Sequence, residues 1–225
     1  MIGIITALAL EAEKLISESE NTVTEEVTGL IFHKITINKK EAVVAVCGVG
    51  KVNAARCAEA MILKYSPDLI INTGVGGALD EGLNIGDIVV SESVTQHDMD
   101  TSPLGDPLGF LSTPPLVFIP ADQVNAEILC ENASELGLTA VKGIIASGDQ
   151  FVCTPEKKAF IKSNFGAIAC EMEGAAIGQV CYLSGVPFVV LRAISDGSND
   201  SSAVDFPTFA KMAANNSAAL LKTLF

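Results

Sequence analysis

The stretch Ala169–Ala176, with the sequence ACEMEGAA, lies where an apolar strand is followed directly by a helix. Two carboxylates, Glu171 and Glu173, flank a methionine at this point. An ionised carboxylate that leaves water loses free energy unless it is paired or hydrogen-bonded. Acids at the end of an apolar strand therefore indicate a functional site, and the strand followed by a helix indicates an α/β fold.

Two further acids occupy comparable positions along the chain. Glu11 follows the first apolar strand, and Asp196 ends the segment Arg192–Asp196 (RAISD) after another one. We expect Glu11, Glu173 and Asp196 to converge at one site. Each also has an ordinary structural interpretation: Glu11 as an exposed glutamate in the first turn of a helix, and Asp196 as an N-cap or turn aspartate before Gly197.

Apolar runs of strand length alternate with helical patterns along the whole chain. Most of these runs are continuous, which predicts strands buried on both faces of a mostly parallel sheet. One run, 32–37, alternates and is joined by the turn 38–40 to the next run, which predicts an antiparallel hairpin. The strands are expected at 2–8, 31–37, 41–47, 69–75, 87–96, 141–147, 167–172 and 187–194.

Helix signals lie between these strands. Thr154 followed by Pro155 is typical of a helix start, Asp205 can cap the last helix, and Gly185 ends another. The segment 98–120 is rich in proline and has no periodicity, so we expect a long functional loop there. The helices are expected at about 9–19, 51–65, 121–136, 155–164, 173–184 and 206–224.

Composition excludes several classes of function. A chain of 225 residues, 49% apolar, is expected to form one domain over 1–225. The net charge of -13 argues against a nucleic-acid partner, and no apolar run reaches the length of a membrane span. Six single cysteines and two histidines predict neither a metal site nor a disulfide framework. No leader sequence is visible, so we expect a cytoplasmic protein. We also expect it to need no metal or cofactor.

Two glycine-rich motifs are candidates for nucleotide binding, and both depart from the strict patterns. Gly48–Lys51 (GVGK) lacks the upstream glycine of a P-loop and is followed by Val52. Gly74–Leu79 (GVGGAL) lacks the third glycine of the dinucleotide fingerprint. We interpret the second motif as a turn after a strand, where a ligand can approach the backbone closely, or as a tight turn packed on a neighbour.

Taken together, these segments resemble the purine nucleoside phosphorylase and nucleosidase superfamily, and within it the methylthioadenosine/S-adenosylhomocysteine nucleosidases. The resemblance implies a three-layer α/β/α sandwich around a mixed, partly closed central sheet. The segments that carry it are IGIITA (2–7) with Glu11, GVGK (48–51), INTGVGG (71–77), GDIVVS (86–91), SGDQF (147–151), EME (171–173) and RAISD (192–196).

The resemblance implies a catalytic role for each of the three acids. Asp196 matches the general acid that protonates the departing purine, and Ser195 could orient it. Glu173 matches the carboxylate that binds the ribose hydroxyls and stabilises positive charge on the sugar, and Met172 packs beneath the sugar. Glu11 matches the residue that holds the attacking water.

The remaining predicted site residues surround the substrate by the same resemblance. A ring at Phe151 stacks on adenine, the backbone of Val152 reads the base edge, and Phe206 closes over the purine. Aromatic residues at such positions also commonly fill cores. The other predicted substrate contacts are Val75, Gly76 and Gly77. Leu8 and Val49 are expected to line an apolar 5' pocket, for which Leu104 is a further candidate.

Arg192 is one of only two arginines in the chain. Because a buried arginine needs an acidic partner, we expect an ion pair with Glu173 more than a contact with substrate. Phosphorylases of the superfamily bind phosphate with several arginines, so hydrolysis is favoured here. Lys51 at a helix N-terminus could still attract an anion. His97 is expected to make loop hydrogen bonds rather than act as a base.

The predicted function is that of an N-glycosyl hydrolase, which cleaves methylthioadenosine and S-adenosylhomocysteine to adenine and the thioribose sugar. A homodimer is expected, in which the long loop contributes to the neighbouring site. One alternative is a purine nucleoside phosphorylase or a futalosine hydrolase. Another is a non-catalytic protein that binds or stores nucleosides.

Overall fold

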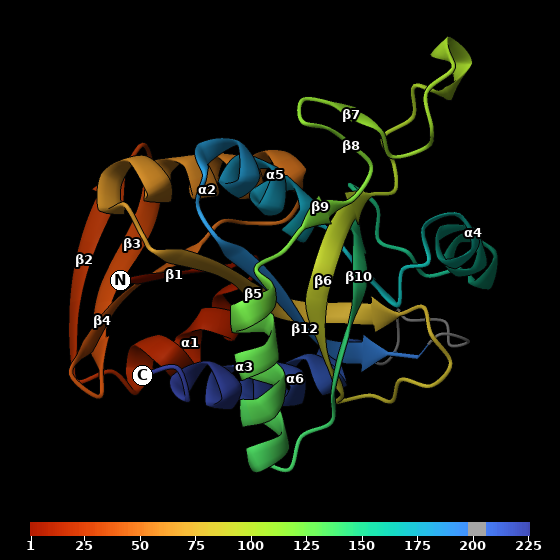
Figure 1. Ribbon diagram of the computed structural model, residues 1–225. Coiled ribbons are helices and arrows are strands. Elements are labelled where there is room, and N and C mark those ends of the chain that lie inside the picture. Colours follow the sequence, from red (N-terminus) through yellow and green to blue (C-terminus); the bar gives the residue numbers. More distant parts are fainter. Residues whose placement is uncertain (198–205) are drawn as a thin grey trace.

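A computed structural model describes residues 1–197 and 206–225 and shows a central mixed sheet with helices on both faces (Figure 1). The sheet order is β11-β10-β6-β12-β5-β1-β4-β3-β2. In chain order, the strands of this path are β1 (Ile2–Thr6), β2 (Asn21–Val27), β3 (Leu30–Ile37), β4 (Lys40–Val46), β5 (Leu69–Ala78), β6 (Ile88–Gln96), β10 (Ala140–Ser147), β11 (Ala169–Glu171) and β12 (Phe188–Asp196).

The sheet closes on itself at one side. Strand β11 pairs in parallel with β10 and antiparallel with the end of β5, while β12 pairs in parallel with β5 and antiparallel with β6. Strands β5, β12, β6, β10 and β11 therefore form a ring. Strands β1 and β4 continue the sheet in parallel, and β2 and β3 add an antiparallel edge. The predicted mixed, partly closed sheet is confirmed.

Helices cover the two faces with separate apolar clusters. On one face α2 (Lys51–Tyr65) and α5 (Gly174–Ser184) pack against the sheet, and on the other face lie α1 (Ala9–Ser17), α3 (Gln123–Glu135) and α6 (Phe206–Lys222). A third, smaller cluster holds α4 (Pro155–Phe165) beside β10 and β11. These layers confirm the predicted three-layer sandwich, since a helix buries its apolar stripe against the sheet.

The predicted elements differ from the observed ones in places that have physical reasons. Strand β2 was not predicted because it is an edge strand with an exposed, polar sequence. The segment 98–120 is not a plain loop, since it contains η1 (Ser102–Leu104), β7 (Leu111–Ser112), β8 (Pro115–Leu116) and β9 (Ile119–Pro120). The expected cap Asp205 lies outside the described residues.

The glycine motif Gly74–Leu79 does not form a turn as predicted. Its first five residues continue β5, where Ala78 and Gly77 pair with β11 and Gly77 also pairs with Asp196 of β12. The expected strand 2–8 instead ends at Thr6, and Leu8 caps α1. Both differences bring side chains from separate elements to one end of the sheet.

Candidate active site

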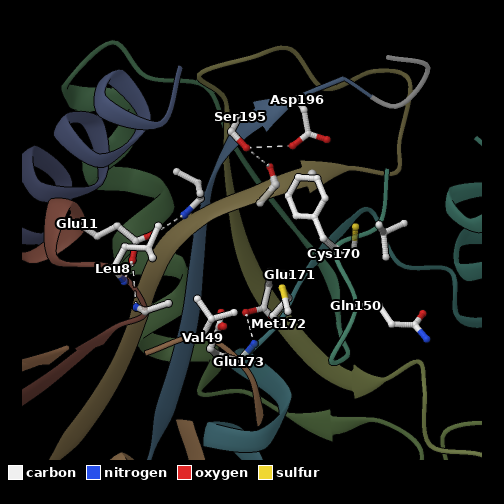
Figure 2. A pocket seen from close by; sticks show the side chains of 16 residues that line it. Leu8, Glu11, Val49, Gln150, Cys170, Glu171, Met172, Glu173, Ser195 and Asp196 are labelled. Carbon is white, nitrogen blue, oxygen red and sulfur yellow. Dashed lines mark hydrogen bonds between the residues drawn. The ribbon is translucent and has the colours of Figure 1, made fainter. Parts of the chain in front are cut away.

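A cavity of about 270 Å³ lies at the ends of β1, β5 and β12 (Figure 2). Ligand sites of open α/β sheets commonly lie at the carboxyl ends of parallel strands. The cavity collects residues from segments that are far apart in the sequence. Its lining is Ala7, Leu8, Glu11, Val49, Val75, Gly76, Gly77, Gln150, Phe151, Val152, Cys170, Glu171, Met172, Glu173, Ser195 and Asp196.

All three acids that the sequence predicts to converge line this cavity, and each is buried. In Figure 2 they approach from different elements, with Glu11 on α1, Glu173 at the start of α5 and Asp196 at the end of β12. The ordinary interpretation of Glu11 as an exposed surface glutamate is therefore wrong.

The Glu11 carboxylate is held entirely by backbone amides in the hydrogen bonds of the described residues. Oε2 accepts from the amides of Ala7 at 3.0 Å and Leu8 at 2.9 Å, and Oε1 accepts from Val75 at 3.2 Å. Burial raises the pKa of this carboxyl, and the amide of Leu8 offsets part of the rise. The result is a fixed, buried carboxylate with an affinity for protons above that of an ordinary glutamate.

The two acids that flank Met172 have different environments. Glu171 accepts from the amides of Glu173 at 3.0 Å and Gly174 at 2.8 Å, and it also contacts the hydroxyl of Ser147. Glu171 therefore caps the start of α5. Oε1 of Glu173 instead accepts from the amide of Gly50 at 2.8 Å.

Glu173 has the more strongly shifted protonation of the two. Burial first, and then the charge of Glu171, raise the pKa of Glu173 to about 7. A carboxylate with this pKa changes charge near neutral pH.

Arg192 is fully buried and does not belong to the lining of the cavity. Its guanidinium pairs closely with Glu171, whereas Oε2 of Glu173 lies 3.8 Å from Nη2. The side chain of Asn72 accepts a further hydrogen bond at 2.5 Å. The predicted pair with Glu173 is present, but the closer partner of Arg192 is Glu171.

At the other end of the cavity, Asp196 accepts two hydrogen bonds from side chains. Oδ1 accepts from Ser195 Oγ at 3.0 Å, and Oδ2 accepts from Lys158 Nζ at 3.0 Å. Lys158 lies on α4 and was missed by the sequence analysis. One signal was present: Lys158 falls on the same stripe of α4 as the buried Ile161 and Phe165, where an unpaired lysine would be costly.

The glycines of β5 give two of these carboxylates their space. A Cβ at Gly74 would lie 2.6 Å from Glu11 Oε1, and one at Gly77 would lie 2.9 Å from Asp196 Oδ2. Both separations are too short for ordinary packing. The motif that resembled a nucleotide-binding sequence thus admits acidic side chains of the chain itself.

The N-terminus of α2 is already bound by carboxylates. Glu173 accepts from the amide of Gly50, and Asp149 accepts from the amide of Lys51 at 2.8 Å. The ammonium of Lys51 pairs with Asp98 at 2.7 Å. The amides and charge that could attract an external anion are therefore occupied by the protein's own acids.

Apolar residues complete the cavity between the acids. Leu8, Val49, Met172 and Val152 line it together with Phe151, whose side chain is half exposed at the rim. By contrast, Leu104, considered for the 5' pocket, is 83% exposed and does not belong to the lining. The side chain of Phe206 lies outside the described residues, although α6 begins there.

The remaining polar groups to place are His97 and the potential metal ligands. The expectation for His97 is wrong: the ring is buried, and neither nitrogen has a hydrogen-bond partner within the described part of the chain. Burial lowers the pKa of His97. Across residues 1–197 and 206–225, no group of three or more His, Cys, Asp or Glu residues could hold a metal ion. In the same residues, no helix is long and apolar enough to cross a membrane.

Comparisons with known proteins show the family of the chain. A family model described as the phosphorylase superfamily matches residues 1–225. The 5'-methylthioadenosine/S-adenosylhomocysteine nucleosidase of Shewanella loihica is 40% identical over 225 residues, which cover 99% of this chain and 97% of the relative.

Solved structures are similar over the same length. A Helicobacter pylori nucleosidase variant with an Asp-to-Asn substitution, holding 5'-methylthioadenosine in its active site, matches with a TM-score of 0.94 and 35% identity over 99% of this chain and 96% of the other. Futalosine hydrolase of the same organism matches with a TM-score of 0.93 and 36% identity at the same coverage. The chain therefore belongs to the phosphorylase superfamily and, within it, to the family of 5'-methylthioadenosine/S-adenosylhomocysteine nucleosidases.

Proposed function

We propose that this protein hydrolyses the N-ribosidic bond of 5'-methylthioadenosine and S-adenosylhomocysteine, releasing adenine and the thioribose sugar. The observation that carries the proposal is the convergence of Glu11, Glu173 and Asp196 around one largely apolar cavity. In the proposed orientation, the purine lies at the base end of the cavity (Asp196, Ser195 and the rim residue Phe151). The ribose lies at the sugar end (Glu11, Glu173 and Met172).

At the base end, the difficult step is departure of the purine anion. A positioned acid that protonates a ring nitrogen makes this group a better leaving group. Asp196 is the acid for this role, and its bond from Ser195 fixes the direction of the carboxyl group. The proton moves from Asp196 to the ring nitrogen as the bond between C1' and N9 breaks.

At the sugar end, positive charge develops on the ribose as the bond breaks. Fixed carboxylates stabilise such charge well where water is excluded. Glu173 serves this purpose and binds the ribose hydroxyls, while Glu11 receives a proton from the attacking water. Two carboxyl groups with room for a water between them perform the same work in inverting glycosidases, by analogy.

The electrostatics of the site favour hydrolysis by water over phosphorolysis. Phosphate would need a cationic or amide-rich position near the sugar. The α2 N-terminus is occupied by Glu173 and Asp149, and Lys51 is paired with Asp98. Of the two arginines, Arg192 is bound to Glu171, and Arg56 contacts the Thr28 carbonyl at the surface.

Futalosine hydrolysis is the second candidate, favoured by the similarity to the Helicobacter pylori futalosine hydrolase. Both reactions need the same acids, so the 5' substituent distinguishes them. Leu8 and Val49 line the cavity, and apolar walls bind a thioether better than a group whose polar atoms would be left without partners.

A substrate panel tests the proposal. The purified protein would be assayed with methylthioadenosine, S-adenosylhomocysteine, adenosine, inosine and futalosine, each with and without phosphate. We expect adenine and free thioribose from the two thioethers at a rate independent of phosphate. Phosphate-dependent formation of a sugar 1-phosphate, preference for futalosine, or tight binding without turnover would each contradict it and identify a different function.

We also propose a homodimer in the cytoplasm. The segment that carries η1, β7 and β8 projects from the body of the protein in Figure 1, and Leu104 at its tip is exposed. Long loops of compact domains are commonly functional, so this segment is the proposed contact with a second copy of the chain. None of the six cysteines is in a disulfide, which supports a reducing compartment. Light scattering of the wild type and of Leu104→Asp would test the dimer, since we expect the variant to be largely monomeric.

A further inference from the structure

Lys158 forms a buried ion pair with Asp196. The reaction steps described above give this lysine no role. Its side chain is 3% exposed, and that of Asp196 is 5% exposed. Nζ donates to Asp196 Oδ2 at 3.0 Å and to the carbonyl of Gly197 at 2.6 Å. A lysine ammonium this deeply buried is costly unless it is paired, so Lys158 and Asp196 depend on one another.

Both carboxyl oxygens of Asp196 accept hydrogen bonds, and one of the two donors is a cation. Oδ1 accepts from Ser195 and Oδ2 accepts from Lys158. The contact with Lys158 is therefore one that the charged form of the acid makes best. A general acid must instead carry a proton before it can donate one.

Within the described parts of the chain, the other groups that face Asp196 carry no competing charge. Cys170 approaches from β11, and burial raises the pKa of its thiol to about 12, which keeps the thiol neutral. Gly77 faces Asp196 from β5 without a side chain, and Ser195 from β12 contributes a hydroxyl. Among the described residues, Lys158 is the only cation that forms an ion pair with Asp196.

We propose that Lys158 is a positioning residue that sets the protonation and acid strength of Asp196. This inference rests on the proposed function. The ammonium stabilises the carboxylate, so a proton that binds Asp196 competes with the ion pair. Once protonated, Asp196 donates to the purine: its O–H bond breaks, the N–H bond forms, and the electrons of the broken C1'–N9 bond stay on the base. The carboxylate so formed is stabilised again by Lys158.

This arrangement has two opposed consequences for the reaction rate. The ammonium makes Asp196 a stronger acid in the transition state, because it stabilises the negative charge that forms there. It also reduces the fraction of enzyme in which Asp196 is protonated at alkaline pH. Removal of the ammonium should therefore slow the reaction at acidic pH and extend activity to more alkaline pH.

The test is the pH profile of kcat/KM for methylthioadenosine in the wild type, Lys158→Met, Lys158→Gln and Lys158→Arg. We expect the alkaline limb of the Met and Gln variants to move up by about 1 to 3 pH units, with a lower maximum of kcat/KM. The Arg variant should keep the wild-type limb. Lys162→Met is the matched control, because Lys162 lies on the same helix and pairs with Asp80 near the surface at 3.1 Å.

The outcomes separate this inference from the proposed function. Unchanged limbs in folded Met and Gln variants, or an equal shift in Lys162→Met, would overturn the role of Lys158 while leaving the hydrolase intact. Absence of wild-type hydrolysis would overturn both. Should the neutral variants fail to fold, infrared difference spectra of wild type against Asp196→Asn read the protonation directly. An Asp196 carboxylate at neutral pH supports the inference, and a protonated carboxyl contradicts it.

Discussion

The sugar end and the base end of the cavity hold buried carboxylates in different ways. At the sugar end, backbone amides bind Glu11 and Glu173, and the nearest guanidinium to Glu173 is 3.8 Å away and paired elsewhere. At the base end, the buried ammonium of Lys158 binds Asp196. Amides are neutral, so burial still raises the pKa of Glu11 and Glu173.

The difference matches the chemistry proposed for each end. Raised pKa values suit carboxylates that accept a proton or stabilise a cation near neutral pH. An ammonium suits an acid that must release its proton readily and be stabilised afterwards. The hydrogen-bond donors around a buried acid thus decide whether it serves as a proton acceptor or as a proton donor.

Substitution of the base-end acid should have the largest effect. Asp196→Asn keeps the shape of the side chain but removes the proton donor, so we expect kcat to fall by about 100- to 10,000-fold, with methylthioadenosine still bound. Single-turnover assays and calorimetric titration would measure the two quantities. Asp80→Asn is the control, because it breaks an ion pair near the surface with Lys162, which lies on the same helix as Lys158. Comparable activity in Asp196→Asn would remove this residue from the acid role.

The two acids around Met172 should separate activity from stability. Glu173→Gln is expected to lower kcat by about 100-fold or more without loss of stability. Glu171→Gln leaves the buried charge of Arg192 without its closest partner, so we expect a loss of about 3 to 5 kcal/mol in the free energy of unfolding. Urea unfolding and kinetics of both variants decide this. The separate roles of Glu173 and Glu171 are contradicted if both variants lose mainly activity or both lose mainly stability.

Glu173 should also set the acidic limb of the pH profile. Its pKa is raised from 4.5 to about 7, so the carboxylate forms as the pH rises through about 7 and kcat/KM should rise with it. Because the folded state binds the proton more tightly than the unfolded state, the stability that this proton contributes is complete below 4.5 and is lost as the pH rises through about 7. Kinetics and urea unfolding against pH, with Glu173→Gln as control, test both effects. An acidic limb that persists unchanged in folded Glu173→Gln would assign it to another group.

Substitution of two glycines of β5 should have the smallest effect, and each glycine tests one end of the cavity. A methyl group at Gly74 would displace Glu11, and one at Gly77 would displace Asp196. We expect each alanine variant to lose roughly tenfold in kcat/KM, equivalent to about 1.4 kcal/mol. Gly74→Ala should alter the acidic limb of the pH profile, because the charge of Glu11 contributes to the raised pKa of Glu173. Gly77→Ala should alter the alkaline limb. Identical profiles in the two variants would show that the ends are not independent.

The sequence predicted the sheet and the convergence of the acids for a clear reason. Continuous apolar runs predict buried strands, and an acid at the end of such a run is costly unless it has a function or a partner. The partners themselves could not be predicted. Lys158 meets Asp196 across 38 positions of the chain, and the choice of Glu171 over Glu173 as the close partner of Arg192 depends on which way each side chain points.

The most direct test of the account is the structure of Asp196→Asn with bound 5'-methylthioadenosine. We predict the purine beside residue 196 at the base end, the ribose between Glu11 and Glu173, and the methylthio group against Leu8 and Val49. A ligand bound outside the cavity, or bound with its purine toward Glu11, would contradict the assignment of the two ends.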